Sequence, residues 1–215
     1  MVKSVSSKSR SLKADNLTVS HPLLRAAGLK SGLLAVMSDD VRLPDPARLA
    51  DGLPAGTVFI LRHYQAPDRL QTALALRQAT RANRQWMLVA DDFRLAAKVR
   101  ADGLHLSGTG LQAGAHFGAV AKARGWLVSA ACHTPSQMQR ASTLGADIVL
   151  LSPVFTTRSH PGQRCLGQHG WVRLASSVGS LNCKIALGGV GTGSAKKLKN
   201  TGLTGIAAIE GLISG

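Results

Sequence analysis

Short apolar runs alternate with amphipathic stretches along most of this chain. The runs are rich in Val, Ile and Leu, which is typical of parallel strands buried on both faces. Between them, apolar residues recur at helical spacing, as Leu70, Ala73, Leu74 and Leu76 do within 68–83. The pattern predicts eight strands, at 32–37, 57–62, 86–90, 103–106, 126–131, 147–151, 184–187 and 204–208.

A helical stretch follows each predicted strand. One of them has a clear start, with Thr134 as N-cap and Pro135 at the first helical position. Three returns from helix to strand have related sequences in which a Gly is expected to cap the helix, and these read RADGLHL, LGADIVLL and TGLTGIAA. The helices are expected at 45–51, 68–83, 93–100, 113–124, 135–144, 169–178, 193–200 and 209–214.

Eight β-α units with short connections predict an α/β fold, a single (β/α)8 TIM barrel. No GxGxxG follows the first strand, which disfavours a dinucleotide-binding fold. The 215 residues suit one barrel domain over 21–215, and the basic, Ser-rich residues 1–20 are predicted to be a disordered tail.

The composition also indicates compartment and partners. No apolar run approaches the roughly 18 residues needed to cross a bilayer, so no membrane partner is expected. Three cysteines without metal-ligand spacing favour a reduced, cytoplasmic setting. Cys132 precedes His133, but adjacent strand residues face opposite sides, which disfavours a Cys-His dyad.

The formal net charge of +15 raises the question of nucleic acid. Aromatic residues make up only 4% of the chain, which leaves little surface for base stacking, and no nucleic-acid-binding motif is present. A basic protein also suits phosphorylated small molecules. We therefore expect a small-molecule phosphate as partner and no nucleic acid, while a homodimer is left open.

Chemistry in a TIM barrel lies where the strands end and the following loops begin. The segment 147–170 is notable there, because a buried strand leads directly into a loop rich in hydroxyls and cations. Gly188 and Gly189 follow strand seven, where this architecture usually binds phosphate. The other candidates at these ends are Arg62, His63, Asp91, Asp92, His105, Ser107, His133, Ile209 and Glu210.

The chain resembles the thiamine phosphate synthase / TenI family. The segments that carry the resemblance are VADDFRLAAKVRADGLHLSG, VSAACHTPSQMQRASTLGADIVLLSPVFTTRSHPG and IALGGVGTGSAKKLKNTGLTGIAAIEGL. It implies a (β/α)8 barrel of the thiazole phosphate branch of thiamine biosynthesis. The SHPG step also resembles a synthase-like domain found fused to Nudix hydrolases.

The resemblance implies an Mg2+–diphosphate half of the site, and here the sequence departs from the synthase pattern. Asp91 matches one metal-binding Asp, whereas Gly110 stands where the second is expected. His160 replaces the diphosphate Lys, and Arg62 alone remains of the strand-two motif. Mg2+ is therefore expected only if synthase activity is retained.

More of the thiazole phosphate half is similar to the family. Thr157 and Ser159 match its phosphate hydroxyls, and Gly188 and Gly189 complete the expected cradle. Ile209 falls on a Val-Ser step that helps to hold the phosphate and is followed here by Glu210 instead of Ser.

In the TenI branch a His after strand five is the acid/base for tautomerisation of a thiazole phosphate carboxylate, and His133 falls on that position. Imidazole can accept a proton from one carbon and return it to another, and this requires no cofactor. The first hypothesis is therefore a metal-independent thiazole tautomerase. The alternatives are a divergent Mg2+-dependent thiamine phosphate synthase and a non-catalytic barrel that binds the phosphate ligand or regulates a partner.

Overall fold

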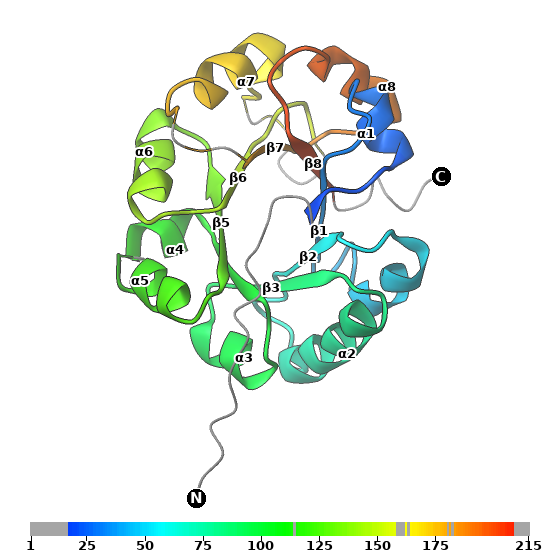
Figure 1. Ribbon diagram of the computed structural model, residues 1–215, viewed down its shortest axis with the longest axis vertical. Helices are drawn as coiled ribbons and strands as arrows, with labels where there is room; N and C mark the ends of the chain where they lie inside the picture. Colours follow the sequence, from blue (N-terminus) through cyan, green and yellow to red (C-terminus); the bar gives the residue numbers. More distant parts are fainter. Residues whose placement is uncertain are drawn as a thin grey trace, which may run out of the picture.

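Eight parallel strands close into a barrel inside a ring of helices (Figure 1), so the predicted (β/α)8 fold is confirmed. The computed structural model describes residues 17–113, 115–157, 162, 164–179, 181 and 183–208. The strands pair in sequence order, and β8 closes on β1. They are β1 Leu33–Met37, β2 Val58–Leu61, β3 Trp86–Ala90, β4 Gly103–Leu106, β5 Leu127–Cys132, β6 Ile148–Leu151, β7 Cys183–Leu187 and β8 Gly205–Ala208.

The helices follow the predicted order with several differences, among them the division of 193–200 into a short α-helix and a 3-10 helix. A short helix before β1 was not predicted, the stretch 113–124 begins earlier and forms two helices, and 45–51 is a 3-10 helix. The last predicted helix, 209–214, lies outside the described residues. The helical segments are α1 Pro22–Ala26, η2 Pro46–Gly52, α2 Arg69–Ala82, α3 Phe93–Lys98, α4 Gly108–Ala113, α5 Ala115–Ala123, α6 Pro135–Thr143, α7 Gly167–Ala175, α8 Thr192–Ala195 and η3 Lys196–Leu198.

The folded region begins earlier than the sequence predicted. Val19 is only 4% exposed, and it exchanges two backbone hydrogen bonds with Gly32, at 2.9 and 3.0 Å. Disorder up to residue 20 was therefore wrong for 17–20, because the backbone pairing and burial of Val19 outweigh the polar composition around it. Residues 1–16 lie outside the described part of the chain.

Alternate strand residues build two separate hydrophobic layers. In β1, Leu33, Ala35 and Met37 point into the barrel, while Leu34 and Val36 face the helices. Every strand except β7 is buried at all of its positions, which explains the continuous apolar runs in the sequence. Trp171 of α7 is fully buried in the outer layer.

A polar residue before each of three even-numbered strands binds the start of the preceding strand. The Asp102 carboxylate accepts the Met87 N–H at 2.9 Å, and Asp147 accepts the Val128 N–H at 2.8 Å. The Thr204 hydroxyl accepts the Lys184 N–H, also at 2.8 Å. The three related helix-to-strand sequences thus share one hydrogen-bonding role, which ties β4 to β3, β6 to β5 and β8 to β7.

The expected Gly caps at these three returns are only partly present. Gly145 has the left-handed backbone with φ +68° after α6, as predicted. After α3 and η3 the same conformation is adopted by Arg100 and Asn200, with φ +53° and +58°. Gly103 and Gly205 instead lie within strands, where a Cβ would collide with the Leu127 and Leu33 backbone.

In the part of the chain that the structure describes, none of the helices combines the length and the apolarity needed to span a bilayer.

Candidate active site

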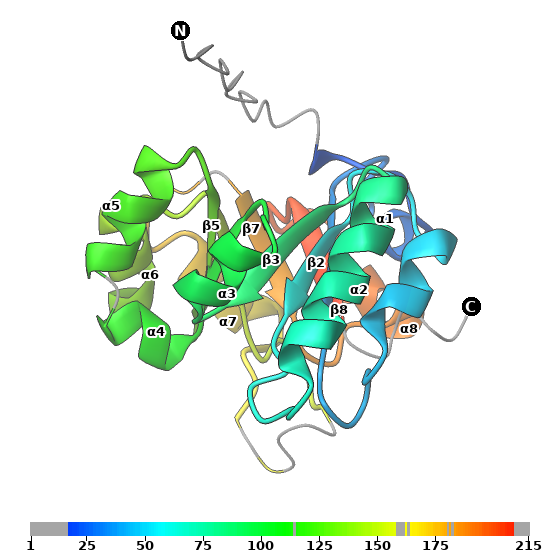
Figure 2. The same cartoon turned by 90° about the horizontal axis from the view of Figure 1, so that it is seen from below.

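The loops that follow the strands lie together at one end of the barrel. Figure 2 shows there the loop after β6, in yellow, beside the loops after β1 and β2, in blue and cyan. His133 follows β5, Arg62 follows β2 and Asp91 follows β3, so these three predicted residues share this end. Thr157 and the pair Gly188-Gly189 follow β6 and β7 at the same end.

His133 is exposed, and its ring is held by the neighbouring strand. Its Nδ1 lies 2.7 Å from the carbonyl oxygen of Ser152, at the end of β6. Because a carbonyl only accepts, Nδ1 carries the proton in this bond, and the lone pair of the neutral ring is on Nε2. The Gln137 side chain accepts the His133 N–H at 2.7 Å and also the Thr134 N–H at 3.2 Å, and the second bond belongs to the capping box that starts α6 at the predicted N-cap, Thr134. The imidazole is therefore oriented with its basic nitrogen away from the barrel wall.

Cys132 does not form a dyad with His133. The thiol is fully buried in the layer between the barrel and the helices, and burial raises its pKa to about 12. It is consequently protonated at neutral pH and faces away from the barrel interior, as the alternation along a strand predicted.

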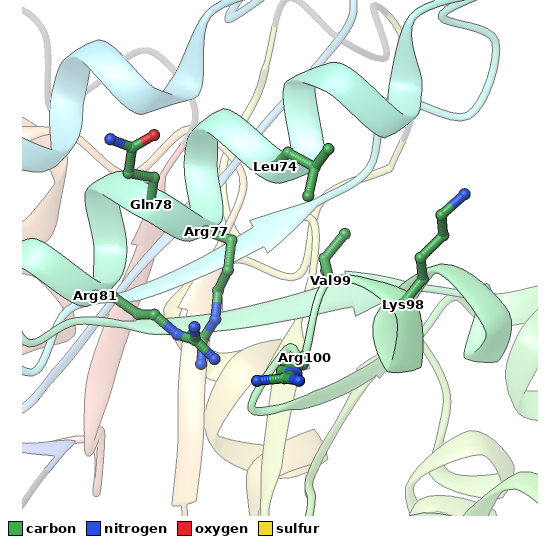
Figure 3. A pocket seen from close by; sticks show the side chains of 7 residues that line it. All are labelled: Leu74, Arg77, Gln78, Arg81, Lys98, Val99 and Arg100. Atoms are coloured by element: carbon green, nitrogen blue, oxygen red, sulfur yellow. The ribbon is translucent and has the colours of Figure 1, made fainter.

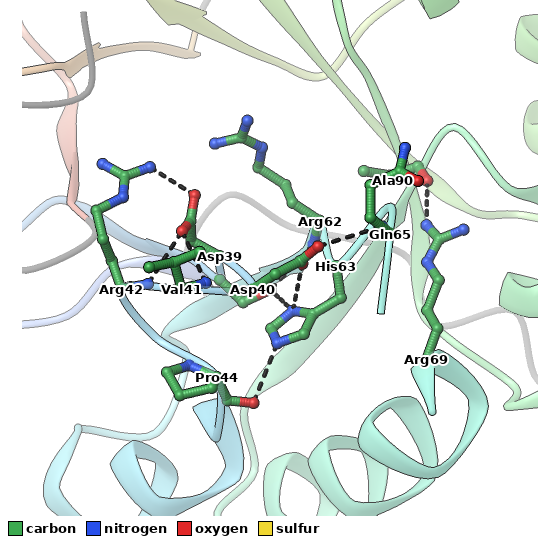
Figure 4. Close-up of polar contacts among 11 residues, drawn as sticks. Asp39, Asp40, Val41, Arg42, Pro44, Arg62, His63, Gln65, Arg69 and Ala90 are labelled. Carbon is green, nitrogen blue, oxygen red and sulfur yellow. Dashed lines mark hydrogen bonds and ion pairs between the residues drawn. The ribbon is translucent and has the colours of Figure 1, made fainter. Parts of the chain in front are cut away.

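His63 is a structural residue. It is 2% exposed, its Nε2 donates to the Pro44 carbonyl at 3.0 Å, and its Nδ1 lies 2.8 Å from the Ser38 hydroxyl (Figure 4). The same hydroxyl accepts the Arg62 N–H at 3.0 Å. These bonds fix the end of β2, and the Arg62 side chain extends away from them in the figure.

An ion pair lies in the loop after β1. The Arg42 side chain donates to Asp39 at 2.6 Å, and this bond, with the Arg42 and Val41 N–H groups that also donate to Asp39, holds the pKa of the Asp39 carboxyl well below its usual range (Figure 4).

Asp91 is exposed but bound by its neighbours. One carboxylate oxygen accepts the Ser107 N–H at 2.9 Å, and the other accepts the Tyr64 hydroxyl at 3.2 Å. Burial, followed by the Asp91 charge, raises the pKa of Tyr64 to about 12, so the phenol keeps its proton for this bond. A Cβ at Gly110 would collide with the Asp91 carboxylate. The present position of Asp91 therefore depends on the absence of a side chain at residue 110.

Tyr64 also links two arginines to this carboxylate. The guanidinium carbons of Arg62 and Arg69 lie 5.8 and 5.6 Å from the centre of its ring. Arg69 in turn binds Asp92 at 3.1 Å and the Ala90 carbonyl at 2.8 Å. Asp92 accepts the Leu95 N–H at 2.9 Å and so caps the N-terminus of α3.

His105 lies beneath this group, inside the barrel. It is 1% exposed, and its Nδ1 is 2.9 Å from the Ser129 hydroxyl on β5. Burial lowers the pKa of His105 to about 4, with smaller opposing effects from Asp91 and Arg62. The ring is therefore neutral at physiological pH and is a residue of the barrel core.

Gly188 and Gly189 bring the loops after β6 and β7 into direct contact. Both have left-handed φ angles, +92° and +65°, and a Cβ on either would press against 153–156. The Phe155 N–H donates to the Gly188 carbonyl at 3.0 Å, which places Thr157 close to the glycine pair. Three further predicted ligands, Ser159, His160 and Ile209, lie outside the described residues.

The α-helix that follows the glycines is short. The α-helical part, α8, has four residues, and Ser194 in it accepts the Gly191 N–H at 2.9 Å. At least one amide at this helix start is therefore occupied within the chain, and the glycine pair is the better candidate for contact with an anion.

Comparison with known proteins assigns the family. Residues 33–212 match the family described as thiamine monophosphate synthase. The chain belongs to that family. A thiamine-phosphate synthase of Chromobacterium violaceum is 30% identical over 195 residues, 84% of this chain and 87% of the relative.

Two further proteins show the range of this similarity. Thiamine phosphate pyrophosphorylase from Pyrococcus furiosus, a solved structure, superposes with a TM-score of 0.68 at 26% identity and covers 82% of this chain and 85% of its own. The thiamine biosynthesis bifunctional protein ThiM/ThiE of Symbiobacterium thermophilum is 31% identical over 160 residues, 72% of this chain. The match covers only 32% of that longer protein.

Within the thiamine monophosphate synthase family, the resemblance implies Mg2+ held by a pair of Asp residues. Mg2+ prefers octahedral oxygen ligands including one or two carboxylates and substrate phosphates, and of the implied pair only Asp91 is present here. Both Asp91 oxygens already accept protein donors, and residue 110 offers no ligand. Among the described residues, no three His, Cys, Asp or Glu side chains are grouped to hold a metal ion.

Two groups that hold candidate site residues in place were not predicted from the sequence. They are the Tyr64 hydroxyl, which binds Asp91, and the Ser152 carbonyl, which binds His133. Tyr64 occupies the last position of the family's strand-two motif, where it could have been considered as a partner for Asp91. The Ser152 carbonyl gives no side-chain signal at all, because any residue at the end of β6 would supply it.

A cavity of about 230 Å3 opens beside Asp91 on the helix side of the strands. Its lining is mostly apolar and consists of Asp91, Asp92, Phe93, Leu104, Leu106, Gly110 and Phe117.

Proposed function

We propose that this protein binds a thiazole phosphate at the mouth of the barrel and acts as a metal-independent thiazole tautomerase, with His133 as acid and base. The observation that carries the proposal is the hydrogen bond from Nδ1 of His133 to the Ser152 carbonyl. It leaves Nε2 of an exposed, oriented imidazole as the base, at the strand end where barrel enzymes do their chemistry.

The reaction needs only a proton acceptor that can return what it takes. Nε2 accepts a proton from one carbon of the dihydrothiazole and becomes imidazolium. The same N–H then protonates a second carbon of the conjugated system, which leaves an aromatic thiazole and a neutral imidazole. Charge and protons balance without any further reactant.

The other residues have binding roles in this proposal. The backbone of Gly188 and Gly189, with Thr157 nearby and Ser159, His160 and Ile209 from the family pattern, would hold the phosphate. Arg62 would attract the negative charge of the substrate from the opposite side of the mouth. Asp91 would keep Tyr64 and the start of the loop after β4 in place and would bind no metal.

The test is turnover of the purified protein on the thiazole phosphate carboxylate, followed with Mg2+ and with a chelator. Wild type should convert it equally in both conditions, and His133→Ala should lower kcat by about 10²- to 10⁴-fold, because it removes the general acid and base. Gln139→Ala, an exposed change further along α6, is the matched control and should retain full activity.

The names of the relatives favour one rival, a divergent thiamine phosphate synthase. Mg2+-dependent condensation of thiazole phosphate with the pyrimidine diphosphate, with no tautomerase activity, would establish that rival. Binding of thiazole phosphate without turnover in either assay, unchanged in His133→Ala, would instead indicate a non-catalytic barrel.

A further inference from the structure

A groove of about 450 Å3 lies on the outer surface of the barrel, between the C-terminal parts of α2 and α3 (Figure 3). Leu74 is 45% exposed there, and the buried Val99 lies across from it. In the figure the Arg77 and Arg81 side chains run from α2 toward one spot with Arg100 close below, while Lys98 lies further along the groove. The lining consists of Leu74, Arg77, Gln78, Arg81, Lys98, Val99 and Arg100.

The positive charge of this groove exceeds what the fold neutralises. Arg77 forms a two-point ion pair with Asp102, at 2.7 and 3.1 Å. Among the described residues, Arg81, Lys98 and Arg100 form no such pair. The C-termini of α2 and α3 together supply at most about one negative charge. The four cationic side chains carry four positive charges. The Asp102 carboxylate and the two helix C-termini offset roughly two of them, so roughly two positive charges remain uncompensated.

The backbone at Arg100 makes Gly a suitable replacement there. Its φ of +53° lies in the left-handed region, at a helix end where Gly is usual. A non-Gly residue in that conformation costs about 1 kcal/mol or more. The chain thus keeps a guanidinium on the groove at a position where Gly would be more stable.

We infer that this groove is an interaction surface for an acidic segment of a partner polypeptide. Carboxylates of such a segment would bind Arg81, Arg100 and Lys98, while its aliphatic side chains would cover the exposed Leu74. Arg77 is only 11% exposed and already paired with Asp102, so the exposed cations would carry the binding. The groove is open along its length, which suits a chain lying across it better than an enclosed metabolite.

Two other occupants fit less well. The lining contains no aromatic side chain on which a nucleic acid base could stack, and its aliphatic surface contributes nothing to phosphate binding. A second copy of this chain would bring the same net charge of +15 to the contact.

The experiment uses the full chain and two fluorescein-labelled peptides, Ac-Glu-Leu-Glu-Glu-Leu-Glu and its Gln-Leu counterpart, with binding read by fluorescence anisotropy at low salt. The test variant is Arg81→Gln/Arg100→Gly, because Gly suits the backbone at residue 100. The control is Lys30→Gln/Arg173→Gln, which removes the same two charges from exposed positions near α1 and on α7, across the barrel (Figure 1).

Wild type should bind the Glu-Leu peptide and not the Gln-Leu peptide, and the groove variant should bind about tenfold more weakly than the control. Equal weakening in both variants would overturn the inference, because net charge alone would then explain binding. Absence of binding of the Glu-Leu peptide to wild type would overturn it too. So would displacement of the peptide by a duplex oligonucleotide whose affinity is lower for the groove variant than for wild type.

Discussion

Two histidines near the barrel mouth differ in their exposure to solvent and in the groups that bind them. His133 is exposed and held by a backbone carbonyl, whereas His105 is buried and held by a hydroxyl. The sequence placed both at strand ends, and the structure shows that their surroundings differ. The sequence could not show how Asp91 is bound, because that depends on Tyr64, which is 27 positions away, and on the missing side chain of Gly110.

Burial of His105 predicts an acid-sensitive stability. The pKa of His105 in the folded protein, about 4, lies below its ordinary value of 6.5. Between these two pH values the residue is protonated in the unfolded chain and neutral in the folded protein. Stability should be unaffected by this residue above pH 6.5 and fall by about 3 kcal/mol between pH 6.5 and 4. Urea unfolding across this range should show the loss in wild type.

The variant His105→Asn isolates this effect, since it cannot titrate and still offers Ser129 a hydrogen bond. Its unfolding free energy should decline less than that of wild type over the same window. Parallel pH profiles for the two proteins would mean that His105 is not protonated on unfolding.

The close approach of Gly189 to the loop after β6 predicts that a side chain at residue 189 destabilises the fold. Gly189→Ala should lower the free energy of unfolding by about 2–4 kcal/mol, because its φ is +65° and a Cβ would collide with the backbone of 155–156. Gly193→Ala is the control, since it lies in α8 with open space around it and should be neutral or up to about 1 kcal/mol stabilising. Equal values from urea unfolding would contradict the contact between the two loops.

At the scale of elements, the strands were predictable and the helix ends less so. Apolar runs located all eight strands within about a residue or two, because both faces of each are covered. The helix α1 was missed because five residues are too few to show a period. The stretch 113–124 was expected as one helix, but residues 108–113 form a separate helix directly after β4.

The side-chain link between β4 and β3 predicts a large cost for losing Asp102. Its side chain is 17% exposed, and it binds both Arg77 and the Met87 N–H. Asp102→Ala should cost about 3–5 kcal/mol of unfolding free energy, because a mostly buried guanidinium loses its partner.

The matched control is Asp45→Ala, which removes a solvent-exposed ion pair with Arg48 and should change stability by less than about 1 kcal/mol. Similar losses in the two variants, measured by urea unfolding, would show that the link does not stabilise the barrel.

For the whole molecule, the periodic pattern was sufficient to predict the closed barrel and the end that carries the candidate site. Net charge was also visible, but its distribution was not, because Arg77, Arg81 and Arg100 gather only when α2 packs beside α3. The same charge bears on assembly, since a homodimer would have to avoid the groove between these helices.

The bond between His133 and Ser152 has a stereochemical consequence for the proposed tautomerisation. Because the carbonyl engages Nδ1, one nitrogen must both remove and return the proton, and it approaches the ring from one side. The transfer should therefore be suprafacial. A deuterium at the donor carbon should appear partly at the acceptor carbon, on the same face, instead of being fully exchanged with solvent.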